Sequence, residues 1–249
     1  MGLNVGKCHL CLQEKPLLKK SHIIPDFIYR NSKIYHNDHT IHKIDLTQAF
    51  GGNFTRRGIQ RSGEYEGNIL CQSCDGKIIN EYEDYAKTIL YKKESSKGNQ
   101  LLYSFSNGEV AVENIDYRKL KLFFLSIIWR ASISSRPFFK EIILDEKKQE
   151  ELREMIFTGN PKNNCDFPIL FFLDAGNDPK LKQYLGQPVS GIENNSFLFT
   201  FPGILVYYLF DINIIPDNLL KYQIFDSGII RFMRLPTKQM WELLQFLFG

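Results

Sequence analysis

Apolar residues at helical spacing mark four stretches of the chain. Between residues 75 and 90 they recur every third or fourth position, which predicts an amphipathic helix. Residues 116–134 predict a long, largely buried helix in which Arg130 needs a partner, because an unpaired buried charge is unfavourable. Residues 145–157 and 236–248 predict two further helices, and Pro25 is compatible with a short helical turn that runs to Arg30.

Strand patterns dominate the last hundred residues. Apolar runs at 168–173, 197–201, 204–210 and 222–233 predict strands. Pro202 and Gly203 predict a hairpin between the middle two, and Asn107 and Gly108 predict another within 101–112. The alternation in 33–44 predicts a hairpin turning at residues 37–38. Helices and strands in separate stretches indicate an α+β fold with an antiparallel sheet and a long buried helix.

A polar, turn-rich segment at 92–99 is the best candidate for a domain boundary. It divides the chain into residues 1–95 and residues 96–249. The second part shows no phosphate-binding glycine motif and no nucleophile elbow. Its expected roles are regulation, substrate selection, or contact with a protein partner or a second copy of the chain.

Four of the five cysteines form two Cys-x-x-Cys pairs that are separated by 59 residues. These are Cys8 with Cys11 and Cys71 with Cys74. Two such pairs supply four thiolates to one tetrahedral ion, so the spacing predicts a structural zinc site. A disulfide framework does not suit so long and cysteine-poor a chain, and a redox pair needs no twin. A zinc ion with four cysteine ligands has no open position, so any hydrolytic chemistry must lie beside it.

Between the two pairs lies the run Ser21-His22-Ile23-Ile24-Pro25, and the second pair is followed directly by Asp75. This combination resembles the ββα-metal finger of the HNH endonucleases over about residues 5–90. The fold that the resemblance implies is an N-terminal, zinc-stapled finger followed by the α+β part. Together with Gly63 and Glu66 ahead of the second pair, the run also resembles a subgroup of bacterial, defence-associated HNH-like proteins.

The resemblance implies roles for individual residues. His22 corresponds to the general base, and Asp75 to a ligand of a catalytic Mg²⁺ or Mn²⁺ ion at the start of a helix. Ser21 stands where the family has an acidic second ligand, and a hydroxyl is a poorer ligand for such a cation. The middle Asn of the motif corresponds to Asn68 or Glu66.

The acidic residues that follow the second cysteine pair have alternative interpretations. Asp75 also suits a helix N-terminus as a cap. Glu81 and Glu83 are expected to be solvated helix residues, although one of them could join the metal shell.

Positive charge is concentrated in the N-terminal part. Residues 7–61 hold ten Lys or Arg against four Asp or Glu, while the whole chain has a net charge of +3. The residues predicted to contact nucleic acid are Lys19, Lys20, Arg56, Arg57 and Arg61. The glycine-rich stretch 50–58 is either a flexible connection or a clamp on phosphates. His36, His39 and His42 are expected to be exposed or to contact phosphate rather than to bind a metal.

The overall composition narrows the class of protein. With 43% apolar and 24% charged residues, the chain is typical of a globular domain and not of a disordered one. It contains no apolar run of membrane-spanning length and no room for a cleaved signal ahead of Cys8, so a cytoplasmic protein is expected. The predicted function is that of a metal-dependent endonuclease, with DNA as the expected substrate. The alternative, favoured by Ser21, is an inactive zinc module that binds nucleic acid or a protein.

Overall fold

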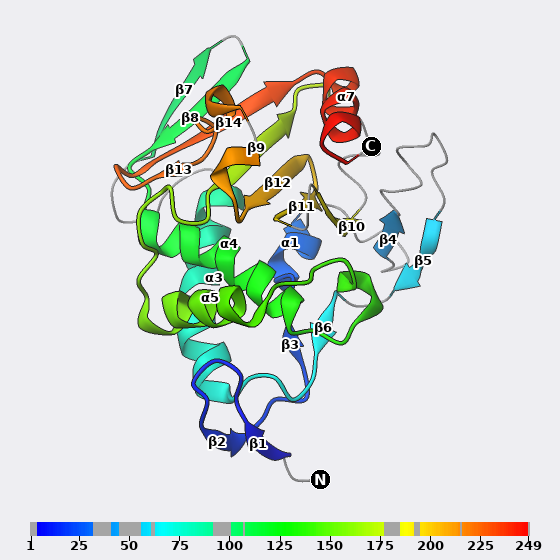
Figure 1. Cartoon of the computed structure of the whole chain (residues 1–249), viewed down its shortest axis with the longest axis vertical. Helices are drawn as coiled ribbons and strands as arrows, with labels where there is room; N and C mark the ends of the chain where they lie inside the picture. Colours follow the sequence, from blue (N-terminus) through cyan, green and yellow to red (C-terminus); the bar gives the residue numbers. More distant parts are fainter. Residues whose placement is uncertain are drawn as a thin grey trace.

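The computed structural model describes residues 4–31, 41–44, 56–60, 63–91, 101–106, 108–176, 185–191, 195–214 and 216–248. At 31, 41–44, 56–60 and 244–248 it describes the backbone alone. Figure 1 shows the helices between residues 80 and 158 below one large sheet, the C-terminal helix at the upper right of that sheet, and the first strands of the chain at the far end.

In these residues ten strands form the large sheet, in the order β5-β4-β10-β11-β12-β9-β14-β8-β7, with β13 paired to β14. Their bounds are Ile41–Ile44 (β4), Arg56–Gln60 (β5), Leu102–Ser106 (β7), Glu109–Glu113 (β8), Ile169–Asp174 (β9), Leu185–Ser190 (β10), Ser196–Phe201 (β11), Ile204–Leu209 (β12), Ile224–Phe225 (β13) and Ile229–Leu235 (β14). Two small antiparallel pairs lie apart from it: Val5–Lys7 (β1) with Glu14–Pro16 (β2), and Ser21–His22 (β3) with Tyr65–Glu66 (β6).

The large sheet is mixed, not purely antiparallel as predicted. Most neighbours run antiparallel, but β10 pairs with β4 and β14 pairs with β9 in parallel. Each parallel pair joins strands that are far apart in the sequence, so no local turn signal announces it. The predicted α+β class is confirmed, and the hairpins at Gly108 and Gly203 are present with φ of +83° and +74°.

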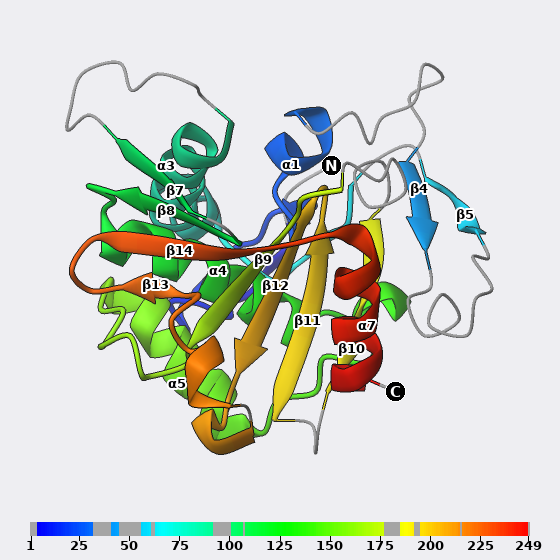
Figure 2. The same ribbon diagram turned by 90° about the horizontal axis from the view of Figure 1, so that it is seen from above.

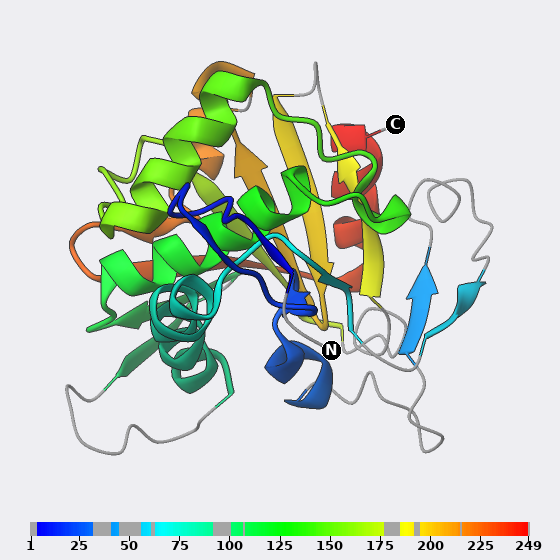
Figure 3. The same ribbon diagram turned by 90° about the horizontal axis from the view of Figure 1, so that it is seen from below.

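The central strands are buried on both faces, and successive residues alternate between two hydrophobic clusters. In β12, Val206 and Tyr208 belong to one cluster, whereas Leu205 and Tyr207 belong to the other, which includes Met240. Figures 2 and 3 show the helices α4 and α5 on one face of the sheet and α7 on the opposite face. Burial on both faces explains why these strands are nearly continuous apolar runs in the sequence.

The predicted helices are all present. They are Asp26–Asn31 (α1), Asn80–Tyr91 (α3), Tyr117–Ser132 (α4), Glu146–Thr158 (α5) and Thr237–Phe248 (α7), and a π-helical segment, Cys74–Ile79 (η1), leads into α3. Short 3₁₀ turns lie at Pro137–Phe139, Ile212–Ile214 and Asp217–Leu219. The Asp116 and Asp145 carboxylates cap α4 and α5 by accepting from the amides of Lys119 and Lys148.

Three parts of the sheet differ from the sequence prediction. Strand β10 was not predicted, since Gly186, Gln187 and Pro188 interrupt its apolar pattern. Its register against β11 shifts between Gly186 and Val189, and such a bulge accommodates a proline that cannot donate a hydrogen bond. The predicted strand 222–233 is divided by a turn with Gly228 at φ +79°. Arg56 and Arg57, predicted in a loop, begin β5.

The N-terminal and C-terminal parts share one core. Cys8, Leu70 and Ile79 belong to the same hydrophobic cluster as Phe123 and Phe232. The β4–β5 pair, also from the N-terminal part, extends the large sheet beside β10. The predicted boundary falls in residues 92–100, outside the described residues, and the division at 95 stays a prediction.

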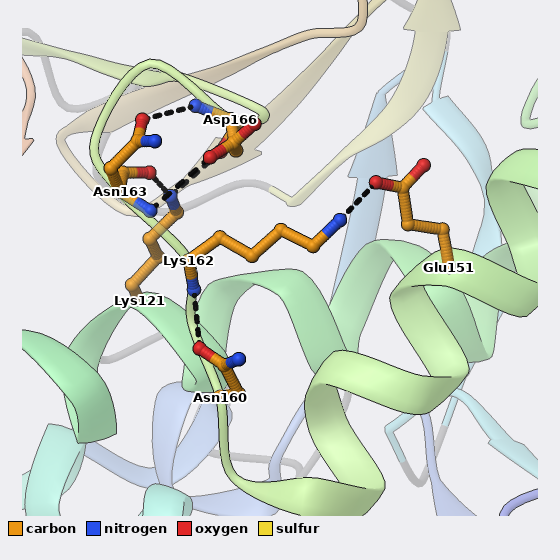
Figure 4. A network of polar contacts seen from close by, with 6 residues as sticks. All are labelled: Lys121, Glu151, Asn160, Lys162, Asn163 and Asp166. Atoms are coloured by element: carbon orange, nitrogen blue, oxygen red, sulfur yellow. Dashed lines mark hydrogen bonds and ion pairs between the residues drawn. The ribbon is translucent and has the colours of Figure 1, made fainter.

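A buried lysine anchors the segment after α5 to α4 (Figure 4). The Lys121 ammonium is 2% exposed and donates to the carbonyls of Asn163 and Asp166 at 2.5 and 2.7 Å, and to the Tyr117 hydroxyl. Burial is the main cause that lowers the pKa of Lys121 to about 8, and the positive charge of Lys162 also lowers it. Asp166, Cys165 and Asp226 act in the opposite direction and raise the pKa. Lys162 is itself paired with Glu151.

Replacing Lys121 with methionine should remove a pH dependence of stability. The folded pKa lies below the unfolded one, so the unfolded state binds more protons above about pH 8 and stability rises with pH. From about pH 7.5 to about pH 9.5 we expect the wild type to gain about 2 kcal/mol relative to Lys121→Met in urea unfolding. Parallel pH profiles of the two proteins would contradict this prediction.

Candidate functional site

The four paired cysteines converge on one point. Cys8 and Cys11 lie in the turn between β1 and β2, where Leu12 has φ +61°. Cys74 begins η1, and Cys71 lies three residues before it. Their Sγ atoms all lie within 4.8 Å of one another. An isolated antiparallel β-bridge between the backbones of Leu17 and Cys71 brings the two pairs together.

The cluster suits a tetrahedral metal ion. With Zn–S bonds of about 2.3 Å, sulfur atoms around zinc are about 3.8 Å apart. This separation is compatible with four Sγ atoms that all lie within 4.8 Å of one another. The Cys71 amide donates to Cys8 Sγ at 3.4 Å, and the Ser73 hydroxyl lies 3.1 Å from Cys71 Sγ. Such contacts orient the ligands of a metal site. The four cysteines can therefore hold a metal ion such as zinc, with the soft thiolate ligands that zinc prefers.

His22 lies in β3, opposite Tyr65 of β6. The two rings are 6.5 Å apart and meet edge to face. Burial lowers the pKa of His22 below its ordinary value; Asp26 and Asp75 oppose this effect and Arg130 adds to it. The imidazole is therefore neutral at pH 7 and can accept a proton.

Asp75 lies next to the strand that carries His22. The Ser21 hydroxyl, 1% exposed, donates to Asp75 Oδ1 at 2.5 Å. Asp75 is not a cap, because residues 72–73 before it are already helical. The serine that stands in place of the expected acid thus holds the carboxylate on η1 beside β3, and none of the described residues forms a hydrogen bond to Asp75 Oδ2.

The two candidates for the middle position of the motif lie in different environments. Glu66 Oε2 accepts from the hydroxyls of Ser134 and Ser135 and from the Ser135 amide, and Oε1 accepts from the Gly67 amide. Burial acts to raise the pKa of Glu66, but these hydrogen bonds outweigh it and lower the pKa. Asn68 is exposed at φ +60°, in a turn where its amide donates to the Leu18 carbonyl.

A buried ion pair supports the His22 strand from behind. Arg130, 1% exposed, donates to the carbonyls of His22 and Ser126, and its guanidinium lies 2.9 Å from Glu83 Oε1. Burial raises the pKa of Glu83, Arg130 opposes the rise, and the negative charge of Asp75 adds to it. The expectation that Glu83 is solvated is therefore wrong, because its Oε1 is buried. Glu81 is exposed and pairs with Arg118 at 2.6 Å.

The predicted basic residues are only partly described. Lys19 and Lys20 are exposed, and the Lys20 ammonium lies 4.7 Å from the centre of the Tyr65 ring. Arg56, Arg57 and His42 lie in β5 and β4, where the backbone alone is described. Arg61, His36, His39 and most of the stretch 50–58 lie outside the described residues.

Sequence reasoning missed Arg136, which lies in the segment after α4. Its guanidinium lies 4.8 Å from the centre of the Tyr65 ring. Sequence reasoning also missed that Glu83 is the partner that Arg130 requires. The apolar surroundings of Arg130 signalled a partner but not which one, since Glu83 lies on a helix with several other acids.

Within the described ranges, no group of three or more His, Cys, Asp or Glu other than the four cysteines is placed to hold a metal. A cation at Asp75 would therefore take most of its ligands from water and substrate, as Mg²⁺ commonly does. No helix in the described part of the chain is long and apolar enough to cross a membrane. Comparison of the chain with models of known families, with characterised proteins and with solved structures finds no significant match.

Proposed function

We propose that the chain is a metal-dependent endonuclease of the HNH type, which hydrolyses phosphodiester bonds of nucleic acid. The observation that carries the proposal is the 2.5 Å hydrogen bond from Ser21 to Asp75. It joins the strand of a neutral histidine to a helix-borne carboxylate, beside a four-cysteine cluster that can hold a metal ion such as zinc. A base and a cation-binding carboxylate in this arrangement are what phosphodiester hydrolysis requires.

The chemistry assigns each group one task. His22 takes a proton from a water molecule as its oxygen forms a bond to phosphorus. The bond from phosphorus to the leaving oxygen breaks, and that oxygen takes up a proton from solvent. Asp75 Oδ2 would hold a Mg²⁺ or Mn²⁺ ion, which supplies neutralisation of the charge that develops on the phosphate. Structural zinc on the cysteines takes no part in the reaction, because all its positions are filled.

We expect purified protein to cut plasmid DNA with Mg²⁺ or Mn²⁺, and His22→Ala to reduce the rate about 10²- to 10⁴-fold, the usual contribution of a general base. Asp75→Asn keeps an acceptor for Ser21 but removes the charge, and should lose cleavage by weakening metal binding. Ser21→Ala leaves both groups in place but frees the carboxylate, so a smaller loss that is partly restored by more Mn²⁺ is expected.

All three variants must retain the zinc content of the wild type, so that a loss of activity is not a loss of fold. Unchanged cleavage by His22→Ala would remove the histidine from the mechanism. A zinc-loaded wild type that binds nucleic acid but never cuts it, with DNA or with RNA, would favour the inactive zinc module, which the missing acid at Ser21 also favours.

A further inference from the structure

Two cations meet on the ring of Tyr65, the cross-strand partner of His22. Lys20 Nζ lies 4.7 Å and Arg136 Cζ 4.8 Å from the ring centre. Each contact with the ring is worth only about 0.5–1 kcal/mol at an exposed site. Neither cation forms an ion pair with a carboxylate of the described residues. The ring contacts therefore leave most of both positive charges to attract an anion that approaches β6.

The position of Arg136 is determined by contacts on both sides of it. Its Nε donates to the Tyr65 carbonyl at 2.8 Å, and its own amide donates to the Ser134 hydroxyl at 3.1 Å. Ser134 and Ser135 are in turn held by Glu66 through three hydrogen bonds of 2.9–3.1 Å. Nε is engaged, and within the described residues the two terminal nitrogens of the guanidinium form no hydrogen bond, so they can bind an anion with both arms, the geometry that suits phosphate.

We infer that Arg136 and Lys20 form a clamp for a backbone phosphate of the nucleic acid, next to the phosphate attacked at His22. This inference rests on the proposed function and extends it: the part of the chain beyond the finger supplies a substrate-binding residue. Tyr65 is the platform that spaces the two cations. Glu66 is a positioning residue that holds the Arg136 segment against β6, and not a member of the catalytic set.

The test is the salt dependence of binding to a short labelled DNA duplex, measured without added divalent cation so that no cleavage occurs. Each lost phosphate contact should reduce the slope of log K against log salt by about 0.9. At about 0.1 M salt, Arg136→Gln and Lys20→Gln should each weaken binding roughly tenfold. Lys238→Gln is the control: the Lys238 side chain lies on α7 and is 89% exposed, and its loss should leave affinity and slope unchanged.

Glu66→Gln tests the positioning role, since it weakens the bonds that hold Ser134 and Ser135. It should reduce the slope as Arg136→Gln does, and the double variant should lose little more than Arg136→Gln alone, because both act through one contact. Equal zinc content and an equal melting temperature show that these variants fold.

The clamp and the nuclease fail in different ways. Cleavage by the wild type with slopes unchanged in Arg136→Gln and Lys20→Gln would overturn the clamp alone. A reduced slope in both variants, in a wild type that never cleaves, would support the clamp and reject the nuclease. A wild type that binds no nucleic acid would overturn both.

Discussion

Cys74→Ser should abolish binding of one zinc ion per chain and lower the melting temperature by about 10–15 °C, a loss of several kcal/mol. The strands around the four cysteines are too short to persist alone: β1 and β2 have three residues each, and β3 and β6 have two. A metal ion held by the four thiolates would tie these strands together, so metal binding would become folding free energy.

The loss should extend beyond the segments around the cysteines. Leu10, Leu70 and Ile79 of these segments and Phe123 and Ile127 of α4 belong to one hydrophobic cluster. Unfolding these segments would therefore expose apolar surface of α4 to water, at about 25 cal/mol per Å². Circular dichroism and zinc content measured on the same samples follow both effects.

Cys165→Ser is the matched control. Cys165 is exposed and lies outside the four-cysteine cluster, so this variant should keep the zinc and the melting temperature of the wild type. If Cys74→Ser kept a full zinc ion and the wild-type melting temperature, the cluster would not be a structural metal site. Removal of the metal from the wild type with a strong chelator should reproduce the Cys74→Ser melting curve.

The cysteine cluster and the helices were predictable because their signals are local. A Cys-x-x-Cys pair curls the backbone by itself, and α4 follows from its own apolar periodicity. The role of Ser21 was not predictable, since its partner Asp75 lies 54 residues away and a serine carries no signal of its own. The sequence shows only that an expected acid is missing, whereas the structure shows a hydroxyl bonded to the carboxylate that remains.

The same limit applies to the support around the site. Glu66 was a candidate for the middle of the motif, but its hydrogen bonds reach Ser134 and Ser135, 68 and 69 residues further along the chain. Arg136 follows a helix end and has no motif around it. Contacts of this kind depend on how α4 packs against the N-terminal part, and neither periodicity nor spacing records that packing.

Arg130→Met should be the most damaging single change outside the four-cysteine cluster, destabilising the fold by about 3–5 kcal/mol. It leaves Glu83 Oε1 buried without its cation and the His22 carbonyl without its donor. Urea unfolding measures the loss of stability. Under the proposed function cleavage should fall as well, because the strand that carries the histidine loses its anchor.

Glu83→Gln should be milder, at about 1–2 kcal/mol. Burial raises the pKa of Glu83 despite the adjacent guanidinium, so ionising this carboxyl in the fold is already unfavourable. A neutral amide can still accept from Arg130, whose guanidine also donates to Ser126 and His22. A loss for Glu83→Gln as large as that for Arg130→Met would contradict this ordering.

The double variant Arg130→Met, Glu83→Leu separates the contribution of Arg130 to stability from its role in positioning His22. Replacing a whole buried ion pair with apolar side chains is often neutral, so the double variant should recover much of the stability that Arg130→Met loses. It cannot restore the hydrogen bond to the His22 carbonyl, so cleavage should stay low in a protein that folds well. Recovery of cleavage together with stability would show that Arg130 only fills the core, whereas a stable but inactive double variant would make Arg130 the residue that positions His22.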